Sequence, residues 1–117
     1  MIEGSVCDDG VPVIDVEVAG TSWRAIIDTG FNGELELPDR MRDHVNARMV
    51  GRVTSILAAN QRVEEDVYLV DFPFDGATVR VQATFVDGDE ILVGTRLLGG
   101  HRLRIDFPAK TVTIERV

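Results

Sequence analysis

Apolar and polar residues alternate along most of this chain, which is the pattern of β-strands that bury one face. Residues 12–18 place three branched aliphatic side chains on one face and two acids on the other, and a second apolar segment follows at 23–27. Because a short connection usually joins antiparallel neighbours, the two segments predict a β-hairpin that ends at Asp28.

The alternation continues to the end of the chain. After a short strand at 34–37, Pro38 suits the first turn of a short helix that ends near Val45. A second short helix is expected at 95–98, where two glycines follow. The remaining strands are expected at 53–57, 63–70, 77–86, 101–107 and 111–115, and the apolar run 91–93 leads into Gly94. About seven strands and two short helices predict an all-β domain, either closed or sandwiched.

Size and charge narrow the range of functions. The 117 residues fit a single domain spanning 1–117, with no repeat, linker or low-complexity segment. Asp and Glu total 20 against 12 Lys and Arg, so the net charge of -8 repels phosphate backbones and anionic head groups. Neither nucleic acid nor a membrane surface is therefore an expected partner.

Cys7 is the only cysteine, which excludes an intrachain disulfide and fits a reducing compartment. The first residues lack the basic and apolar regions of a signal peptide, and no apolar run reaches about 18 residues. We therefore expect a cytoplasmic protein without a membrane span.

The strongest candidate for chemistry is Asp28, which stands between the apolar run 25–27 and a turn containing Thr29, Gly30 and Gly33. Glycine lets the backbone fold closely around a carboxylate and direct amide hydrogens at it. Partial burial and hydrogen bonding both shift the pKa of a carboxyl group, so Asp28 is a candidate for acid–base catalysis. The alternative is an ordinary turn after a strand, because Asp, Thr and Gly are common turn residues.

The order of these features resembles the retropepsin-like (clan AA) single-domain aspartic proteases, in particular the microbial branch in which Phe follows Asp-Thr-Gly. Residues 25–30 resemble the strand and loop that carry the catalytic carboxylate, and 53–70 resembles the β-hairpin flap that covers the substrate. Residues 91–98 and 103–114 resemble the glycine-containing element and the closing hairpin of such lobes. The resemblance implies a closed β-barrel lobe with one or two short helices.

It also implies an aspartic endopeptidase in which Asp28 is catalytic while Thr29 and Gly30 support the catalytic loop. The reaction needs two carboxylates that share one proton, since two like charges so close cannot both ionise. This chain has a single Asp-Thr-Gly, so the resemblance implies a homodimer that acts on peptides or proteins, with one Asp28 from each subunit. No metal or organic cofactor is required.

Further candidates follow from the same resemblance. Phe31 replaces the small or hydroxyl residue of many relatives and is a candidate to line a substrate pocket. The tip of the flap is expected at four residues, namely Ala58, Ala59, Asn60 and Gln61.

Other polar residues carry no expected chemistry. His44 and His101 have no partner at metal-ligand spacing, and the acidic turn at 87–90 lacks the ligand order of a calcium loop, so no metal site is expected. Two other interpretations stay open for the whole chain. One is a non-catalytic dimer of the same fold that holds extended peptides by strand addition. The other is a monomer in which Asp28 only caps its turn.

Overall fold

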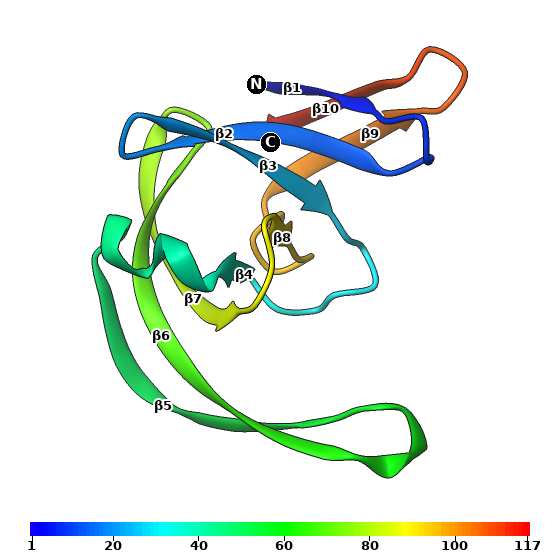
Figure 1. Ribbon diagram of the computed structural model, residues 1–117. Coiled ribbons are helices and arrows are strands. Elements are labelled where there is room, and N and C mark those ends of the chain that lie inside the picture. The colour runs from blue at the N-terminus through cyan, green and yellow to red at the C-terminus, as the bar shows by residue number, and fades with distance from the viewer.

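Ten strands form one continuous sheet in the computed structural model, which describes residues 1–117 (Figure 1). In chain order the strands are β1 (Ile2–Val6), β2 (Pro12–Val18), β3 (Thr21–Ile27), β4 (Leu35–Pro38), β5 (Ala47–Ile56), β6 (Arg62–Phe74), β7 (Ala77–Val86), β8 (Ile91–Val93), β9 (His101–Asp106) and β10 (Thr111–Arg116). Two 3-10 helices, η1 (Asp39–His44) and η2 (Ala58–Asn60), complete the secondary structure. The predicted all-β class is confirmed.

The strand order across the sheet is β5-β6-β7-β4-β8-β3-β2-β1-β10-β9. The hairpins β2–β3, β5–β6 and β9–β10 are antiparallel, as the alternation predicts. Two parallel pairings, β3 with β8 and β4 with β7, join segments that are far apart in the chain. These parallel pairings place the loop after β3 beside the segment after β8.

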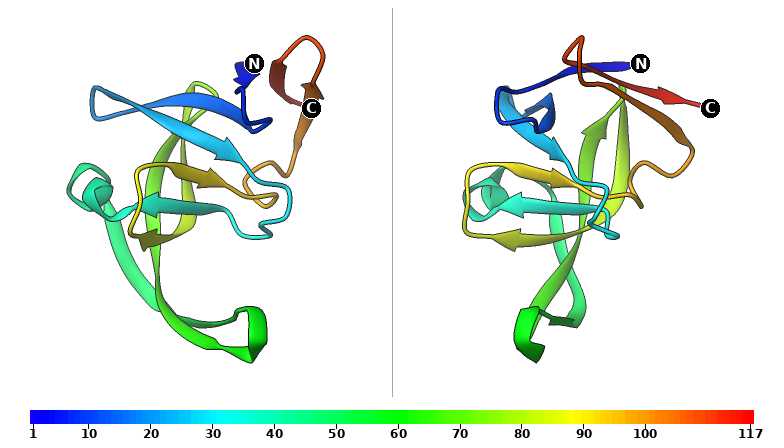
Figure 2. Two further views of the ribbon diagram at one scale, coloured as in Figure 1. Left: turned by 45° about the vertical axis from the view of Figure 1, so that its right-hand side comes forward. Right: turned by 90° about the vertical axis from the view of Figure 1, so that its right-hand side faces the viewer.

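The sheet does not close into a barrel, so the expected closed β-barrel is wrong. Strands β5 and β9 lie at opposite ends of the strand order, and each leaves one edge unpaired. The sheet curls instead, so that β2 contacts β6 although the two are not neighbours. Figure 2 shows the layer of β1, β2, β9 and β10 at one end of the molecule and the tip of the β5–β6 hairpin at the other.

Inward-facing side chains of the alternating strands fill the interior of this curled sheet. Ile14 of β2, Leu37 of β4 and Phe72 of β6 are each at most 1% exposed, and Met41 attaches η1 to the same core. No polar or charged side chain is buried among them. The core therefore gains stability from apolar burial without the desolvation cost of unpaired charges.

The first strand, β1, was not among the expected strands. Most of its residues pair with β10 at the other end of the chain, with Ile2 opposite Ile114, whereas only Ser5 and Val6 pair with the next strand, β2. No local pattern indicates the pairing with β10. Gly4 also interrupts the apolar alternation of this segment. A Cβ at position 4 would clash with the Val13 carbonyl oxygen and lie 2.7 Å from Cγ2 of Ile14. A glycine is needed where β1 lies this close to its antiparallel neighbour β2.

The helix expected at 95–98 is also wrong, because this segment forms a series of turns. The Gly99 amide donates to the Arg96 carbonyl oxygen at 3.3 Å and the His101 amide to the Leu98 carbonyl oxygen at 2.9 Å, and these bonds close separate turns that Gly99 and Gly100 end. The amides of Thr95 and Arg96 donate to the loop after β3. The expected helix after Pro38 is present as η1, a 3-10 helix in which Arg42 pairs with Asp39 at 2.9 Å. No helix of the structure has the length and apolar character needed to cross a membrane.

Candidate active site

Asp28 is the first residue after β3. In the parallel pairing of β3 with β8, Ile27 lies opposite Val93, and the Asp28 amide donates to the Val93 carbonyl oxygen at 3.0 Å. Ala25 and Ile27 are buried, whereas Asp28 is partly exposed. The strand pairing therefore determines where this carboxyl group leaves the core.

The loop after β3 holds the Asp28 side chain by one oxygen. Oδ1 accepts a hydrogen bond from the Gly30 amide at 2.9 Å, and the Asp28 carbonyl oxygen accepts one from the Phe31 amide at 3.1 Å. A Cβ at position 30 would lie 3.2 Å from Oδ1, so glycine is what permits this close approach. Thr29 and Gly30 are both exposed, which leaves this face of the loop open to a partner or a ligand.

The segment after β8 supports the loop from behind. The amides of Gly94, Thr95 and Arg96 donate to the carbonyl oxygens of Glu34, Phe31 and Gly33, at 3.0, 2.9 and 3.1 Å respectively. A Cβ on Gly94 would clash with the Gly33 carbonyl oxygen and lie 2.8 Å from Cδ2 of Phe31. Sequence reasoning named this glycine only as part of the resemblance, although a glycine directly after an apolar run signals a close backbone approach.

A groove of about 360 Å³ lies between the loop, β4, β7 and the β5–β6 hairpin. Its lining is mixed, with carboxylates from β4 and β6 beside apolar side chains from the hairpin. The residues that line it are Phe31, Gly33, Glu34, Leu35, Glu36, Val53, Ser55, Leu57, Glu65, Val67, Gln82, Ala83, Thr84 and Arg96.

A larger hollow of about 480 Å³ lies between β1, β2 and the β6–β7 turn. It shares no residue with the loop after β3 or with the segment after β8. Volume alone is therefore a poor guide here, and the smaller groove is the one that adjoins Asp28 through Phe31 and Gly33.

The electrostatics of the groove are dominated by acids. Burial raises the pKa of the Glu36 carboxyl group, and the negative charges of Glu65 and Asp28 raise it further. The charge of Glu36 on β4 therefore interacts with those of Glu65 on the hairpin and of Asp28, the candidate catalytic residue. No sequence signal identifies Glu36 or Glu65, because acids on the polar face of a strand are ordinary surface residues.

The β5–β6 hairpin occupies the position expected of a flap, and it projects beyond the rest of the sheet (Figure 1). At its tip the Leu57 amide donates to the Gln61 carbonyl oxygen at 2.7 Å. The tip has no glycine, yet Ala59 and Asn60 both adopt left-handed backbone angles, with φ of 61° and 58°. Asn tolerates this conformation well, whereas Ala is strained in it.

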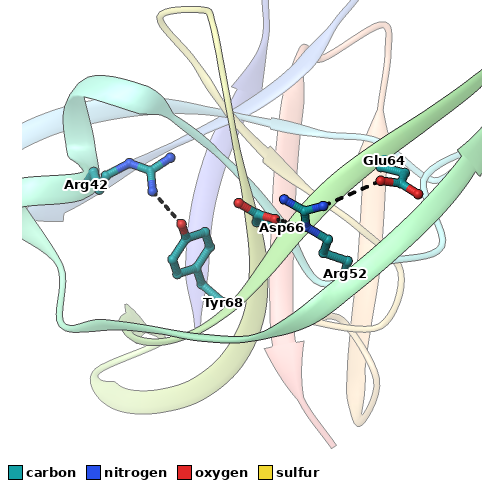
Figure 3. Close-up of polar contacts among 5 residues, drawn as sticks. All are labelled: Arg42, Arg52, Glu64, Asp66 and Tyr68. Atoms are coloured by element: carbon teal, nitrogen blue, oxygen red, sulfur yellow. Dashed lines mark hydrogen bonds and ion pairs between the residues drawn. The ribbon is translucent and has the colours of Figure 1, made fainter.

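Polar contacts link the two strands of the hairpin and join its base to η1 (Figure 3). Arg52 of β5 pairs across the strands with Asp66 at 2.9 Å and with Glu64 at 3.5 Å. Nearer the sheet, Arg42 of η1 donates to the Tyr68 hydroxyl at 2.8 Å. The pairing shifts register between Met49 and Gly51, so the hairpin has an irregularity between these two sets of contacts.

The structure brings only part of the predicted site together. Asp28, Thr29, Gly30 and Phe31 share one loop, and Phe31 lines the groove. The predicted tip residues 58–61 lie at the end of the hairpin, are exposed and do not line the groove. The hairpin contributes its strand residues to the groove in their place.

Solved structures of retropepsin-like proteases are similar to this chain. A retropepsin-like aspartic protease from Rickettsia conorii matches with a TM-score of 0.69 at 18% identity, over 98% of this chain and 89% of that chain. The simian foamy virus (mac) protease matches with a TM-score of 0.58 at 20% identity, over 74% of this chain and 91% of that one. The retroviral protease-like domain of Ddi1 from Leishmania major matches with a TM-score of 0.54 at 14% identity, over 90% and 88%.

No protein-family model and no curated protein matches the chain. At identities this low, structural likeness establishes the fold and leaves the activity to be argued from the site. The fold of this chain is that of the retropepsin-like aspartic proteases, and the resemblance drawn from the sequence is confirmed at that level.

Proposed function

We propose that the protein is an aspartic endopeptidase whose active site forms between two copies of the chain. Asp28 carries the proposal. On a retropepsin-like fold, the loop after β3 holds this carboxyl group by one oxygen, next to a groove that the β5–β6 hairpin covers.

A homodimer follows from the chemistry. The aspartic-protease mechanism needs one carboxylate as base and one carboxyl group as acid, and this chain offers one Asp28. Two-fold symmetry supplies the second from an identical loop. The exposure of Thr29 and Gly30 supports an interface at this loop, where Thr29 is expected to hydrogen-bond across the axis.

The proposed reaction uses the two carboxyl groups as one unit that shares a proton. The ionised Asp28 takes a proton from water while the water oxygen bonds to the carbonyl carbon of the peptide. The protonated Asp28 of the other protomer gives its proton to the carbonyl oxygen. The Asp28 that took the proton from water then gives it to the amide nitrogen, while the other Asp28 takes a proton from a hydroxyl group of the tetrahedral intermediate. The carbon–nitrogen bond breaks, and the two carboxyl groups again share one proton.

Cleavage of a diverse peptide mixture, followed by mass spectrometry from about pH 4 to about pH 7.5, tests the activity. Wild-type protein is expected to yield discrete products that are absent with Asp28→Asn. Asp87→Asn removes the same type of group from an exposed turn and is the matched control, which should cleave as wild type does. Products that persist in Asp28→Asn would refute the role of Asp28.

Subunit mixing tests the shared site. When equal amounts of wild type and Asp28→Asn exchange subunits freely, about a quarter of the dimers carry two intact Asp28 residues. Total activity should therefore fall well below that of the same wild-type protein mixed with buffer. Asp87→Asn should cause no such fall. Activity unaffected by excess Asp28→Asn would show that each chain acts alone.

A non-catalytic peptide-binding dimer is the second candidate, and the free edge of β5 favours it. The outer edge of this strand has no neighbour in the sheet, so an extended peptide can add to it. For such a binder, Asp28→Asn should leave peptide affinity unchanged, and no products should appear with either protein.

A further inference from the structure

The groove beside Asp28 contains two carboxylates that form no ion pair within the chain. Glu36 comes from β4 and Glu65 from the facing strand β6, and both line the groove. Neither forms an ion pair, and Glu34, which also lines the groove, accepts the Gln82 amide at 3.0 Å. Two acidic side chains thus face the same partly enclosed space without neutralisation.

Other acids of β6, outside the groove, form ion pairs with arginines. Arg52 pairs with Glu64 and Asp66 on the same hairpin, and Arg80 pairs with Asp71 at 3.1 Å. Arg96 is the one cation that lines the groove, and it forms no ion pair with either acid. Glu36 and Glu65 therefore differ from these paired acids in facing, without an ion pair, the space that a ligand would fill.

Burial makes it unfavourable for both carboxyl groups of this groove to be ionised. Glu36 is partly buried, and its pKa is raised by burial first and then by repulsion from Glu65 and Asp28. A cation placed between Glu36 and Glu65 would relieve both effects, because an opposite charge favours the ionised carboxylate. The empty groove is thus complementary to positive charge.

The walls of the groove also suit the stem of a basic side chain. Phe31, Val53, Leu57 and Val67 supply apolar surface beside the carboxylates. Lys and Arg pack their methylene groups on such surface while their charged ends reach polar partners. We propose that the groove selects peptides with a Lys or Arg side chain near the cleaved bond, held by Glu36 and Glu65. The inference rests on the proposed function, since it assigns the specificity of the same site.

Matched peptide pairs test this selectivity. Each pair differs only in having Lys or its neutral analogue norleucine at one position, and the position is scanned on both sides of a mapped cleavage site. Wild type is expected to show a higher kcat/KM for the Lys peptide at one position. The preference should fall about fivefold for each groove acid replaced by its amide. Glu36→Gln combined with Glu65→Gln should therefore bring the ratio of kcat/KM for the Lys peptide to that for the norleucine peptide, both measured with this variant, close to one.

The net charge of -8 attracts basic peptides to any face of the protein, so a control must remove the same charge elsewhere. Glu3→Gln combined with Glu115→Gln does so at exposed positions on β1 and β10. This double variant should keep the preference for Lys. Equal loss of preference in both double variants, or no preference in wild type, would overturn the inference.

A binding measurement separates this inference from the proposed function. Fluorescence anisotropy of the same labelled peptides with Asp28→Asn needs no turnover. If no peptide is cleaved but Asp28→Asn binds Lys peptides more tightly through Glu36 and Glu65, the protease assignment fails and the specificity stands. If peptides are cleaved yet Asp28→Asn binds both members of a pair equally, the specificity fails and the protease assignment stands.

Discussion

Gly94→Ala is expected to disturb the site and the fold together. The added Cβ would overlap the Gly33 carbonyl oxygen and lie 2.8 Å from both the Gly33 carbonyl carbon and Cδ2 of Phe31. The phenyl ring can rotate, but the Gly33 backbone is held by the Arg96 amide at 3.1 Å. The substitution must therefore push the segment after β8 away from the loop that carries Asp28.

The magnitude follows from overpacking against an atom that cannot move aside. Such changes cost up to about 3 kcal/mol of unfolding free energy, and this site belongs at the upper end because backbone opposes backbone. With a urea dependence of about 2 kcal/mol per molar, the midpoint of unfolding should fall by about 1.5 M. Equilibrium urea unfolding followed by circular dichroism measures this directly.

Gly51→Ala is the matched control. A Cβ there meets no atom within 4 Å, and the Gly51 backbone is not left-handed, so its midpoint should stay close to that of wild type. An unchanged midpoint for Gly94→Ala, or equal shifts for both variants, would refute the argument that this contact fixes the loop. Peptide cleavage by Gly94→Ala should also fall, since the loop that holds Asp28 moves.

Three further variants test the core, the hairpin and the groove. Phe72→Ala should lower the free energy of unfolding by about 4 kcal/mol, because Phe72 is 0% exposed; a loss under about 1 kcal/mol in urea titrations would contradict its place in the core. Arg52→Ala should change that free energy by less than about 1 kcal/mol, since its ion pairs with Glu64 and Asp66 are exposed; a larger loss would show that the hairpin contacts are coupled. Glu36→Gln should increase the free energy of unfolding at pH 7. The pKa of Glu36 is raised in the folded protein, so its ionisation destabilises the fold as the pH rises above the ordinary pKa of 4.5. Thermal unfolding from about pH 3 to about pH 8 should show this gain vanishing at the acidic end, and a gain independent of pH would contradict the assignment.

Local periodicity was enough to predict most strands and the loop of Asp28. Alternation depends on neighbouring residues, so the hairpin of β2 and β3 and its end at Asp28 could be identified without knowing the rest of the fold. Each of these features is determined within a few positions along the chain.

Features that depend on distant contacts could not be predicted in this way. The pairing of Ile2 with Ile114 makes β1 a strand, and the free edges of β5 and β9 keep the sheet from closing. The segment 95–98 forms turns where it lies against the loop of Asp28, to which the amides of Thr95 and Arg96 donate. In each case the deciding partner lies more than 60 residues away or is missing altogether.

Glu36 shows how the two kinds of information combine. The alternation Glu34-Leu35-Glu36-Leu37 correctly places both leucines in the core and both acids on the opposite face. It does not reveal that this polar face lines a groove together with the β5–β6 hairpin, where burial first and then the charge of Glu65 raise the pKa of Glu36. A residue that would be an ordinary surface acid on an isolated strand thus becomes partly buried and repelled by its neighbours. Local rules are most often broken at functional sites, where the stability lost serves binding. The gain in stability expected of Glu36→Gln and its expected loss of selectivity for Lys are therefore two measurements of the same unneutralised charge.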